Sequence, residues 1–289
     1  MAQATGASKN LTVAMNESTS PAPSAGRPAQ LLKIIACEIA VREICQVAAT
    51  SPNLVDMEFL TQGHHDVPCR GRADIQGRVD AVPAGRYDAI LIGYGLCSNM
   101  LAGLRATHTP LVIPRAHDCI TLFLGSKERY HELFTAQPGS YYYTSGWLEC
   151  VRRRGVEALE QGLMFMPSNH KAAAEATYLK WVEKYGEEQA QYLRKEMGGW
   201  SASYQRGVLI GFEFTQALGL REQVQRICTD QSWQFTEVPG DLSLFRRWVD
   251  GQWEAQDFLV VPPGWVVAPS NEPGIIKAEP AEATPPPAS

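Results

Sequence analysis

Residues 87–99, with the sequence YDAILIGYGLCSN, decide the fold of this chain. The segment is a short apolar run bounded by turn-forming residues, which is typical of a buried strand. Gly93 and Gly95 let the backbone turn sharply where the strand ends and expose successive amides at the junction. Ser98 stands where a dinucleotide-binding fingerprint has its third glycine, so that type of site is disfavoured. We therefore interpret the end of this segment as a tight turn that carries the thiol of Cys97.

Four other apolar runs have the same character. Each is short and is bounded by turn-forming or polar residues: LLKIIA (31–36), VDMEFL (55–60), TPLVIP (109–114) and SYYYTSG (140–146). Helical segments separate several of these runs, among them EIAVREICQVAAT (38–50), DIQGRVDAVPAG (74–85) and ITLFLGSKERYHELFTAQ (120–137). Strands that alternate with helices predict an α/β protein with a mostly parallel, Rossmann-like sheet and flanking helices.

The chain divides into five predicted segments. Residues 31–147 form an N-terminal α/β lobe that carries the reactive side chains, and residues 148–206 form a helical segment. Residues 207–268 return to a β-α-β-α-β rhythm, which predicts a second, smaller α/β lobe or an extension of the first sheet. Residues 1–30 and 269–289 are rich in Ala, Ser, Thr, Pro and Gly, so we expect a disordered leader and a disordered tail.

The overall composition excludes several classes of protein. A net charge of −5 over 289 residues argues against a general nucleic-acid binder, which usually has a basic excess. No apolar run approaches the roughly 20 residues that cross a bilayer, so we expect no membrane partner. The first thirty residues lack the apolar core of a secretory signal. The seven cysteines are therefore expected in a reduced, cytoplasmic setting, as core residues, ligands or catalysts.

Reactive side chains follow three of the predicted strands. Cys37 follows LLKIIA, Cys97 follows YDAILIGYGL, and His117 and Cys119 belong to PLVIPRAHDC. Because the carboxyl ends of parallel strands share one edge of a sheet, we expect these four side chains to meet. Three thiols and an imidazole suit zinc, and three thiolates with an open corner suit an iron–sulfur cluster. The sequence does not choose between these metals.

The same residues also allow a site without metal. Cys97 or Cys119 would then be the nucleophile and His117 its base. Arg115 beside a thiol would lower its pKa. Glu149, after the fifth predicted strand, is a candidate general acid or base. A purely structural network that joins Arg115 to Asp118 and buries His117 is the remaining interpretation.

A cationic helix start offers a place for a small anionic substrate. Ser126, Lys127 and Arg129 lie together in LGSKERY, and with Arg115 they suit a phosphate or a carboxylate. A solvated charged turn is the alternative interpretation.

Five segments together resemble a known family. The pattern IACE, YGLC, PRAHDCITLFLGSKERY, PGSYYYTSGW and GQWEAQDFLVVPPG resembles the domain-of-unknown-function family 1638 of bacteria and archaea, over nearly all of residues 32–267. Ser98-Asn99-Met100 stands where the resemblance implies a more glycine-rich stretch. The resemblance adds Tyr94 and Tyr130 to the candidate substrate-binding residues Arg115, Ser126 and Arg129. Its motif residues are Cys37, Glu38, Tyr94, Gly95, Cys97, Arg115, His117, Asp118, Cys119, Ser126, Arg129 and Tyr130.

The resemblance implies a setting near corrinoid-dependent methyltransferases. The leading hypothesis is a metalloprotein or enzyme whose centre of Cys37, Cys97, Cys119 and His117 acts in methyl or thiol transfer linked to corrinoid metabolism. A corrinoid protein or a methyltransferase is the implied partner. Two alternatives stay open: a metal-free cysteine enzyme, and a non-catalytic accessory protein that docks on such a methyltransferase system.

Overall fold

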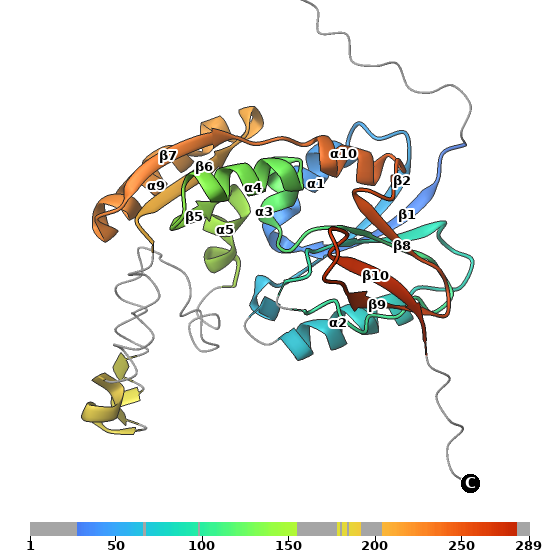
Figure 1. Ribbon diagram of the computed structural model, residues 1–289, viewed down its shortest axis with the longest axis horizontal. Helices are drawn as coiled ribbons and strands as arrows, with labels where there is room; N and C mark the ends of the chain where they lie inside the picture. Colours follow the sequence, from blue (N-terminus) through green and yellow to red (C-terminus); the bar gives the residue numbers. More distant parts are fainter. Residues whose placement is uncertain are drawn as a thin grey trace, which may run out of the picture.

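A five-stranded sheet forms the centre of the molecule. The computed structural model describes residues 28–65, 68–97, 99–154, 178–179, 181–183, 185–191 and 204–281. The strand order is β2-β1-β3-β4-β8; the first four strands run parallel and β8 runs antiparallel to β4. This arrangement confirms the predicted α/β class with a mostly parallel sheet (Figure 1). The strands are β1 (Leu31–Cys37), β2 (Leu54–Leu60), β3 (Ala89–Gly93), β4 (Leu111–Pro114) and β8 (Phe258–Val261).

Helices cover both faces of this sheet. Figure 1 shows α1 (Val41–Ala48) and α10 (Ser243–Val249) on one side and α2 (Pro68–Asp80) on the other. All five residues of β3 are buried, which explains why the run is apolar throughout rather than alternating. Trp248 of α10 is fully buried, and its indole Nε1 donates a hydrogen bond to the carbonyl of Val112 at 3.2 Å.

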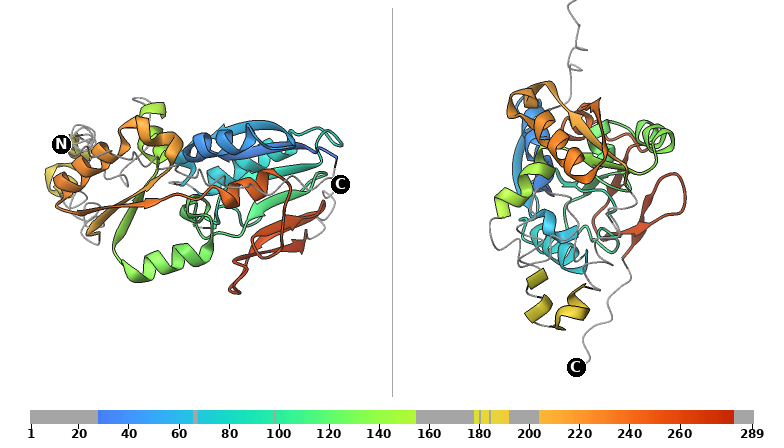
Figure 2. Two further views of the ribbon diagram at one scale, coloured as in Figure 1. Left: turned by 90° about the horizontal axis from the view of Figure 1, so that it is seen from above. Right: turned by 90° about the vertical axis from the view of Figure 1, so that its left-hand side faces the viewer.

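A second, three-stranded sheet lies beside the first. Its strands β5 (Ser140–Tyr143), β6 (Arg206–Gly211) and β7 (Gln234–Pro239) are all parallel, in the order β5-β6-β7. Helix α9 (Leu220–Gln231) packs on β6 and β7. Figure 2 shows this sheet at one end of the molecule and the five-stranded sheet toward the other.

The pairing of two strands differs from the predicted division into lobes. β5 lies within the predicted N-terminal lobe but pairs with β6 of the second sheet. β8 lies within the predicted C-terminal lobe but pairs with β4 of the first sheet. The chain therefore passes from the first sheet to the second and back again.

The prediction of a disordered tail over residues 269–289 is wrong for its first part. The chain turns at residues 262–264, and β9 (Trp265–Pro269) then pairs with β10 (Ile276–Pro280) as an antiparallel hairpin. Ile275 and Ile276 are buried, so burial of apolar surface stabilises this segment despite its Pro-rich neighbours. Residues 1–27 of the predicted leader and the last eight residues lie outside the described residues, as does most of the predicted helical segment.

The hairpin is tied to the loop that leads into β4. The backbone N–H of Gly103 donates to the carbonyl of Val267 at 2.7 Å, and the N–H of Val267 donates to the carbonyl of Leu104 at 2.8 Å. In the part of the chain that the structure describes, no helix is long and apolar enough to cross a membrane.

Candidate functional site

The loops that follow β3 and β4 are joined to each other. The backbone N–H of Cys97 donates to the carbonyl of His117 at 2.9 Å, and the N–H of Leu96 makes a second bond of this kind. A Cβ at Gly95 would lie 2.7 Å from the backbone of Asp118, so the loops approach this closely only because residue 95 is a glycine. The glycine therefore serves the contact between two loops, both at the carboxyl edge of the sheet.

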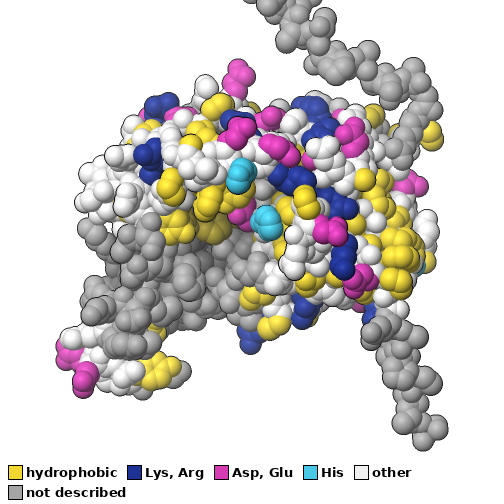
Figure 3. All heavy atoms as spheres, in the orientation of Figure 1, with side chains coloured by type: hydrophobic (Ala, Val, Ile, Leu, Met, Phe, Trp, Pro, Cys, Tyr) yellow, Lys and Arg dark blue, Asp and Glu magenta, His cyan; other side chains and the backbone are white. Residues whose placement is uncertain are grey.

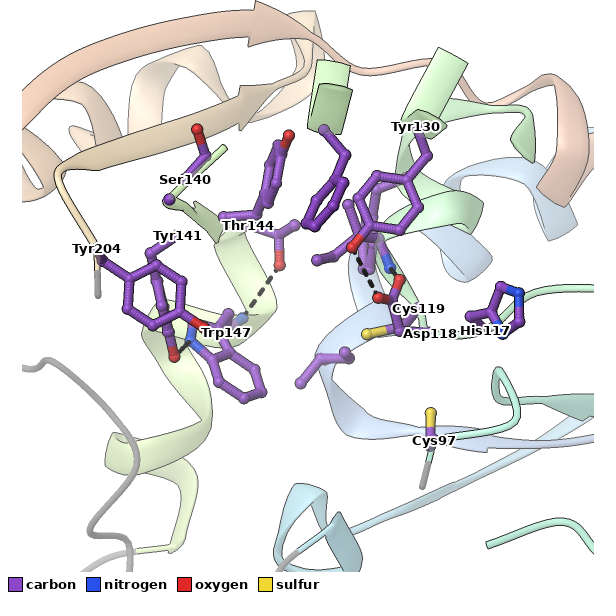
Figure 4. A pocket seen from close by; sticks show the side chains of 16 residues that line it. Cys97, His117, Asp118, Cys119, Tyr130, Ser140, Tyr141, Thr144, Trp147 and Tyr204 are labelled. Atoms are coloured by element: carbon purple, nitrogen blue, oxygen red, sulfur yellow. Dashed lines mark hydrogen bonds between the residues drawn. The ribbon is translucent and has the colours of Figure 1, made fainter. Parts of the chain in front are cut away.

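Two thiols on these loops line one pocket. Cys97 and Cys119 both border a cavity of about 490 Å³ between the two sheets. Figure 4 shows both side chains in a close view of this cavity. Cys97 adopts a left-handed backbone conformation with a φ of 44°, which is unusual for a residue other than glycine. Cys37, at the end of β1, is buried and does not line the pocket, but its charge would act on both Cys97 and Cys119.

All three thiols are protonated at neutral pH when no cation is bound to them. Burial is the main cause, and it raises the pKa of Cys97 to about 12. Burial also raises the pKa of Cys37 and of Cys119 far above the usual range, and the neighbouring thiols and Asp118 add to the rise at Cys119. A neutral thiol is a poor nucleophile and a poor ligand.

Asp118 holds Tyr130 in the wall of the pocket that the two thiols border. Its Oδ2 accepts a hydrogen bond from the Tyr130 hydroxyl at 2.9 Å, and its Oδ1 accepts one from the backbone N–H of Ile120 at 3.0 Å. The second bond fixes the start of α3 (Ile120–Leu124). Burial raises the pKa of the Asp118 carboxyl. The structural network predicted between Arg115 and Asp118 is replaced by this contact with Tyr130.

His117 borders the same pocket, but Figure 4 shows its ring extending away from the sulfur of Cys119. Among the described residues, no three Cys, His, Asp or Glu side chains already surround one point in a way that would hold a metal ion.

The two arginines predicted for anion binding contact backbone carbonyls instead. Arg115 Nε donates to Ala255 at 2.8 Å, and its Nη1 donates to Gly274 at 2.9 Å and to Ile276. Neither Arg115 nor Arg129 is among the described residues that line the pocket.

Arg129 lies on α4 (Lys127–Ala136), and its guanidinium donates to the carbonyls of Leu124 at 3.2 Å and Pro239 at 2.5 Å. Ser126 is the N-cap of this helix, and its Oγ accepts the N–H of Arg129 at 3.1 Å. The cationic turn thus joins α4 to the end of β7.

Glu149 and Tyr94 lie outside the pocket lining as well. Glu149, on α5 (Ser145–Arg154), forms an ion pair with Arg42 at 2.8 Å. Tyr94 is buried, and within the described residues its hydroxyl has no hydrogen-bond partner. The parallel register pairs Ala36 with Gly93, so Tyr94 follows β3 beside Cys37.

Seven of the sixteen described residues that line the pocket are aromatic, and sequence reasoning missed this aromatic wall. The strand β5 and the start of α5 supply one side of it, and α3 and α4 supply much of the other. The run YYYTSGW predicts the end of a strand, and its high aromatic content is the signal that points to the wall. The aromatic lining residues are Phe123, Tyr130, Phe134, Tyr141, Tyr142, Trp147 and Tyr204.

A family model described as "Protein of unknown function (DUF1638)" matches residues 59–249, which is more than half of the chain. The chain belongs to the DUF1638 family. The match confirms the resemblance found in the sequence. A search of curated proteins found no match, and neither did a search of solved structures.

The DUF1638 match covers only part of the structure around the pocket. It contains the loops of Cys97 and Cys119 and the aromatic residues from Phe123 to Tyr204. Cys37 and the β9–β10 hairpin lie outside the matched residues.

Proposed function

We propose that this DUF1638 protein binds a thiophilic metal at Cys37, Cys97 and Cys119 and transfers a methyl or thiol group on a substrate held in the aromatic pocket. The supporting observation is that Cys97 and Cys119 border the pocket while Cys37 lies close enough for its charge to act on both. Zinc or an iron–sulfur cluster suits a set of thiolates.

The burial of these thiols favours the metal over a bare nucleophile. A free thiolate needs a nearby cation, and the described pocket lining contains neither Lys nor Arg. A metal ion displaces the thiol protons and supplies the missing positive charge. Because no three candidate ligands among the described residues already surround one point, the cysteine side chains would have to rotate toward the metal.

The transfer has two reactants, the substrate and one cysteine thiolate that has lost its proton. A thiolate lone pair forms the new S–C bond to a methyl group, and the leaving group departs with the electrons of the bond that held it. The aromatic wall excludes water from this step. Tyr130, held by Asp118, orients the part of the substrate nearest the sulfur atoms.

Metal content tests the proposal. Protein purified without oxygen and without a metal-affinity tag should contain about one zinc ion per chain, or iron with sulfide and a broad visible absorption band. Serine substitution of Cys37, Cys97 or Cys119 should remove most of this metal. Cys45→Ser is the matched control, because Cys45 is an exposed thiol on α1. Full occupancy in all three site variants, or no metal in the wild type, would refute the metal proposal.

A second candidate is a metal-free cysteine enzyme, because Cys97, Cys119 and His117 all border the same pocket. In that case one thiol, Cys97 or Cys119, should be alkylated first by iodoacetamide at neutral pH, and mass spectrometry would locate it. His117→Gln should slow that reaction if the imidazole acts as the base.

The corrinoid link rests on the family resemblance. We propose a corrinoid protein or a corrinoid-dependent methyltransferase as the partner, on the aromatic-rich side of the molecule. Co-purification that survives Cys97→Ser would support a purely accessory role, whereas loss of transfer in Cys97→Ser with co-purification intact would support catalysis.

A further inference from the structure

Aromatic side chains face each other across the pocket. On one side, the ring of Tyr130 meets Tyr142 edge to face, with centroids 5.9 Å apart and an interplanar angle of 84°. On the other side, Tyr141 meets Tyr204 with centroids 5.2 Å apart and an interplanar angle of 85°. Figure 4 shows Tyr130 across an open space from Tyr141 and Tyr204, with Trp147 below Tyr141.

Hydrogen bonds hold both groups in place. The indole Nε1 of Trp147 donates to the Tyr141 hydroxyl at 3.1 Å, and Tyr130 is held by Asp118. The rings therefore lose little further freedom when a ligand enters. Figure 3 shows hydrophobic side chains gathered on this face of the molecule, below α4 and β5.

The charge of the pocket suits a cation. The described lining residues include no Lys or Arg, and Asp118 is the only carboxylate among them. Burial raises the pKa of Tyr141 and of Tyr142, so both phenols stay neutral at physiological pH and keep the electron-rich ring faces of neutral aromatics. An anion would meet the negative faces of the rings, and no Lys or Arg among the described lining residues would balance its charge.

We propose that the pocket binds a methylated onium group, a quaternary ammonium or a sulfonium, between these rings. Such a cation cannot donate hydrogen bonds, so its charge is recognised by aromatic faces at close range. A cavity of about 490 Å³ has room for a small molecule that carries this group. The inference rests on the proposed function in one respect: it names this onium as the methyl-bearing substrate.

Methyl transfer from an onium group to a cysteine that has lost its proton needs no further reactant. The C–N or C–S bond breaks with its electron pair on the leaving heteroatom, which becomes a neutral amine or thioether, while the thiolate lone pair forms the new S–C bond. The positive charge that the rings bind is lost in the same step, so the product binds more weakly than the substrate.

Titration calorimetry on the full chain tests the binding. The probes are choline and its neutral isostere 3,3-dimethylbutan-1-ol, which have the same shape but differ in charge. Choline should bind at least about tenfold more tightly, because only the cation is attracted by the ring faces. Equal affinities would overturn the proposal, since shape and apolar contact would then account for all binding, and no binding of either probe would overturn it too.

Two substitutions at one position keep this test independent of folding. Trp147→Leu should weaken choline at least about tenfold, whereas Trp147→Phe retains a ring and should lose much less. Trp265→Leu, at a partly exposed tryptophan on the distant β9 strand, is the matched control and should leave choline affinity unchanged. Similar losses in all three variants, or none in Trp147→Leu, would count against the aromatic site.

The Cys97→Ser and Cys119→Ser variants separate this inference from the proposed function. If they lose metal and still bind choline, both proposals stand. If the wild type binds choline but never metal, the onium site stands and the metal centre fails. If it binds metal but prefers the neutral isostere, the metal centre stands and the onium inference fails.

Discussion

The two larger sheets end in hollows of different character. The five-stranded sheet ends at a pocket of about 490 Å³ lined by thiols and aromatic rings. The three-stranded sheet ends, at Gly211 of β6 and Pro239 of β7, at a wider hollow of about 1030 Å³ that contains the ion pair of Arg221 and Glu237. Topology places a hollow at both edges. Burial and residue type decide what each can do: the first places the buried thiol of Cys97 beside the partly buried thiol of Cys119, and the second leaves charges exposed.

The largest contrast should come from adding one methyl group at each edge. Gly95→Ala brings its Cβ within 2.7 Å of the Asp118 backbone, which cannot move without separating the two loops. We expect a loss of about 3 kcal/mol in the free energy of unfolding. Gly211→Ala meets only the mobile end of the Glu237 side chain at 2.7 Å and should cost far less. Urea unfolding measures both, and equal losses would show that the loop contact is not tight.

Removal of an arginine is the second contrast. Arg115→Leu leaves partly buried carbonyls, including that of Gly274, without their donor, so we expect a loss of about 2 kcal/mol. Arg221→Leu breaks an ion pair in which the arginine side chain is 57% exposed, and the loss should stay below about 1 kcal/mol. Thermal unfolding tests the order; a larger loss in Arg221→Leu would reverse our view of which arginine is structural.

Carboxylates provide a contrast in pH dependence. Glu43 is fully buried, its Oε1 accepts a bond from Ser145 at 3.1 Å, and burial raises its pKa to about 7. The folded protein therefore holds this proton more tightly than the unfolded chain does, and stability falls as pH rises from about 4.5 to about 7.

Glu43→Gln should remove that fall, which we expect to be on the order of 2 kcal/mol. Glu237→Gln, at the partly exposed and paired carboxylate of the other edge, should leave the fall in place. The measurement is urea unfolding at a series of pH values. A wild type and a Glu43→Gln variant with parallel pH profiles would rule out the buried proton.

The smallest contrast concerns two tyrosine–aspartate hydrogen bonds. Tyr130→Phe removes the partly buried bond to Asp118 and should cost about 1 kcal/mol. Tyr87→Phe removes an exposed bond to Asp56 of 2.6 Å, and water replaces it, so the change should lie within about 0.5 kcal/mol. If both losses were equally small, the hydrogen bond between Tyr130 and Asp118 would not contribute measurably to the free energy of unfolding.

Local sequence patterns were sufficient to predict most strands of the five-stranded sheet. Short apolar runs predicted its parallel strands, because a strand buried on both faces has no polar alternation. The rule that parallel strands share a carboxyl edge predicted Cys97 and Cys119 as neighbours, and both border one pocket. Both side chains follow directly from the ends of adjacent strands.

Contacts between distant segments could not be predicted in this way. The aromatic wall depends on β5 pairing with β6, whose first residue lies more than 60 positions farther along the chain. Arg115 is predicted as an anion ligand, but it binds backbone carbonyls at residues 255–276. These partners could not be predicted, because every residue has a backbone carbonyl and the sequence therefore does not mark them. The β9–β10 hairpin could not be predicted, because the Pro and Gly residues around it are typical of a disordered segment.

The β9–β10 hairpin also has a consequence for the order of assembly during translation. It bonds to the loop after Cys97 through Val267, and it accepts the guanidinium of Arg115, two residues before His117. Since a chain leaves the ribosome from its N-terminus, the thiol loops emerge long before the segment that braces them. We expect the pocket to reach its final shape only after Ile276 has been released, so that any ligand enters a finished chain rather than a growing one.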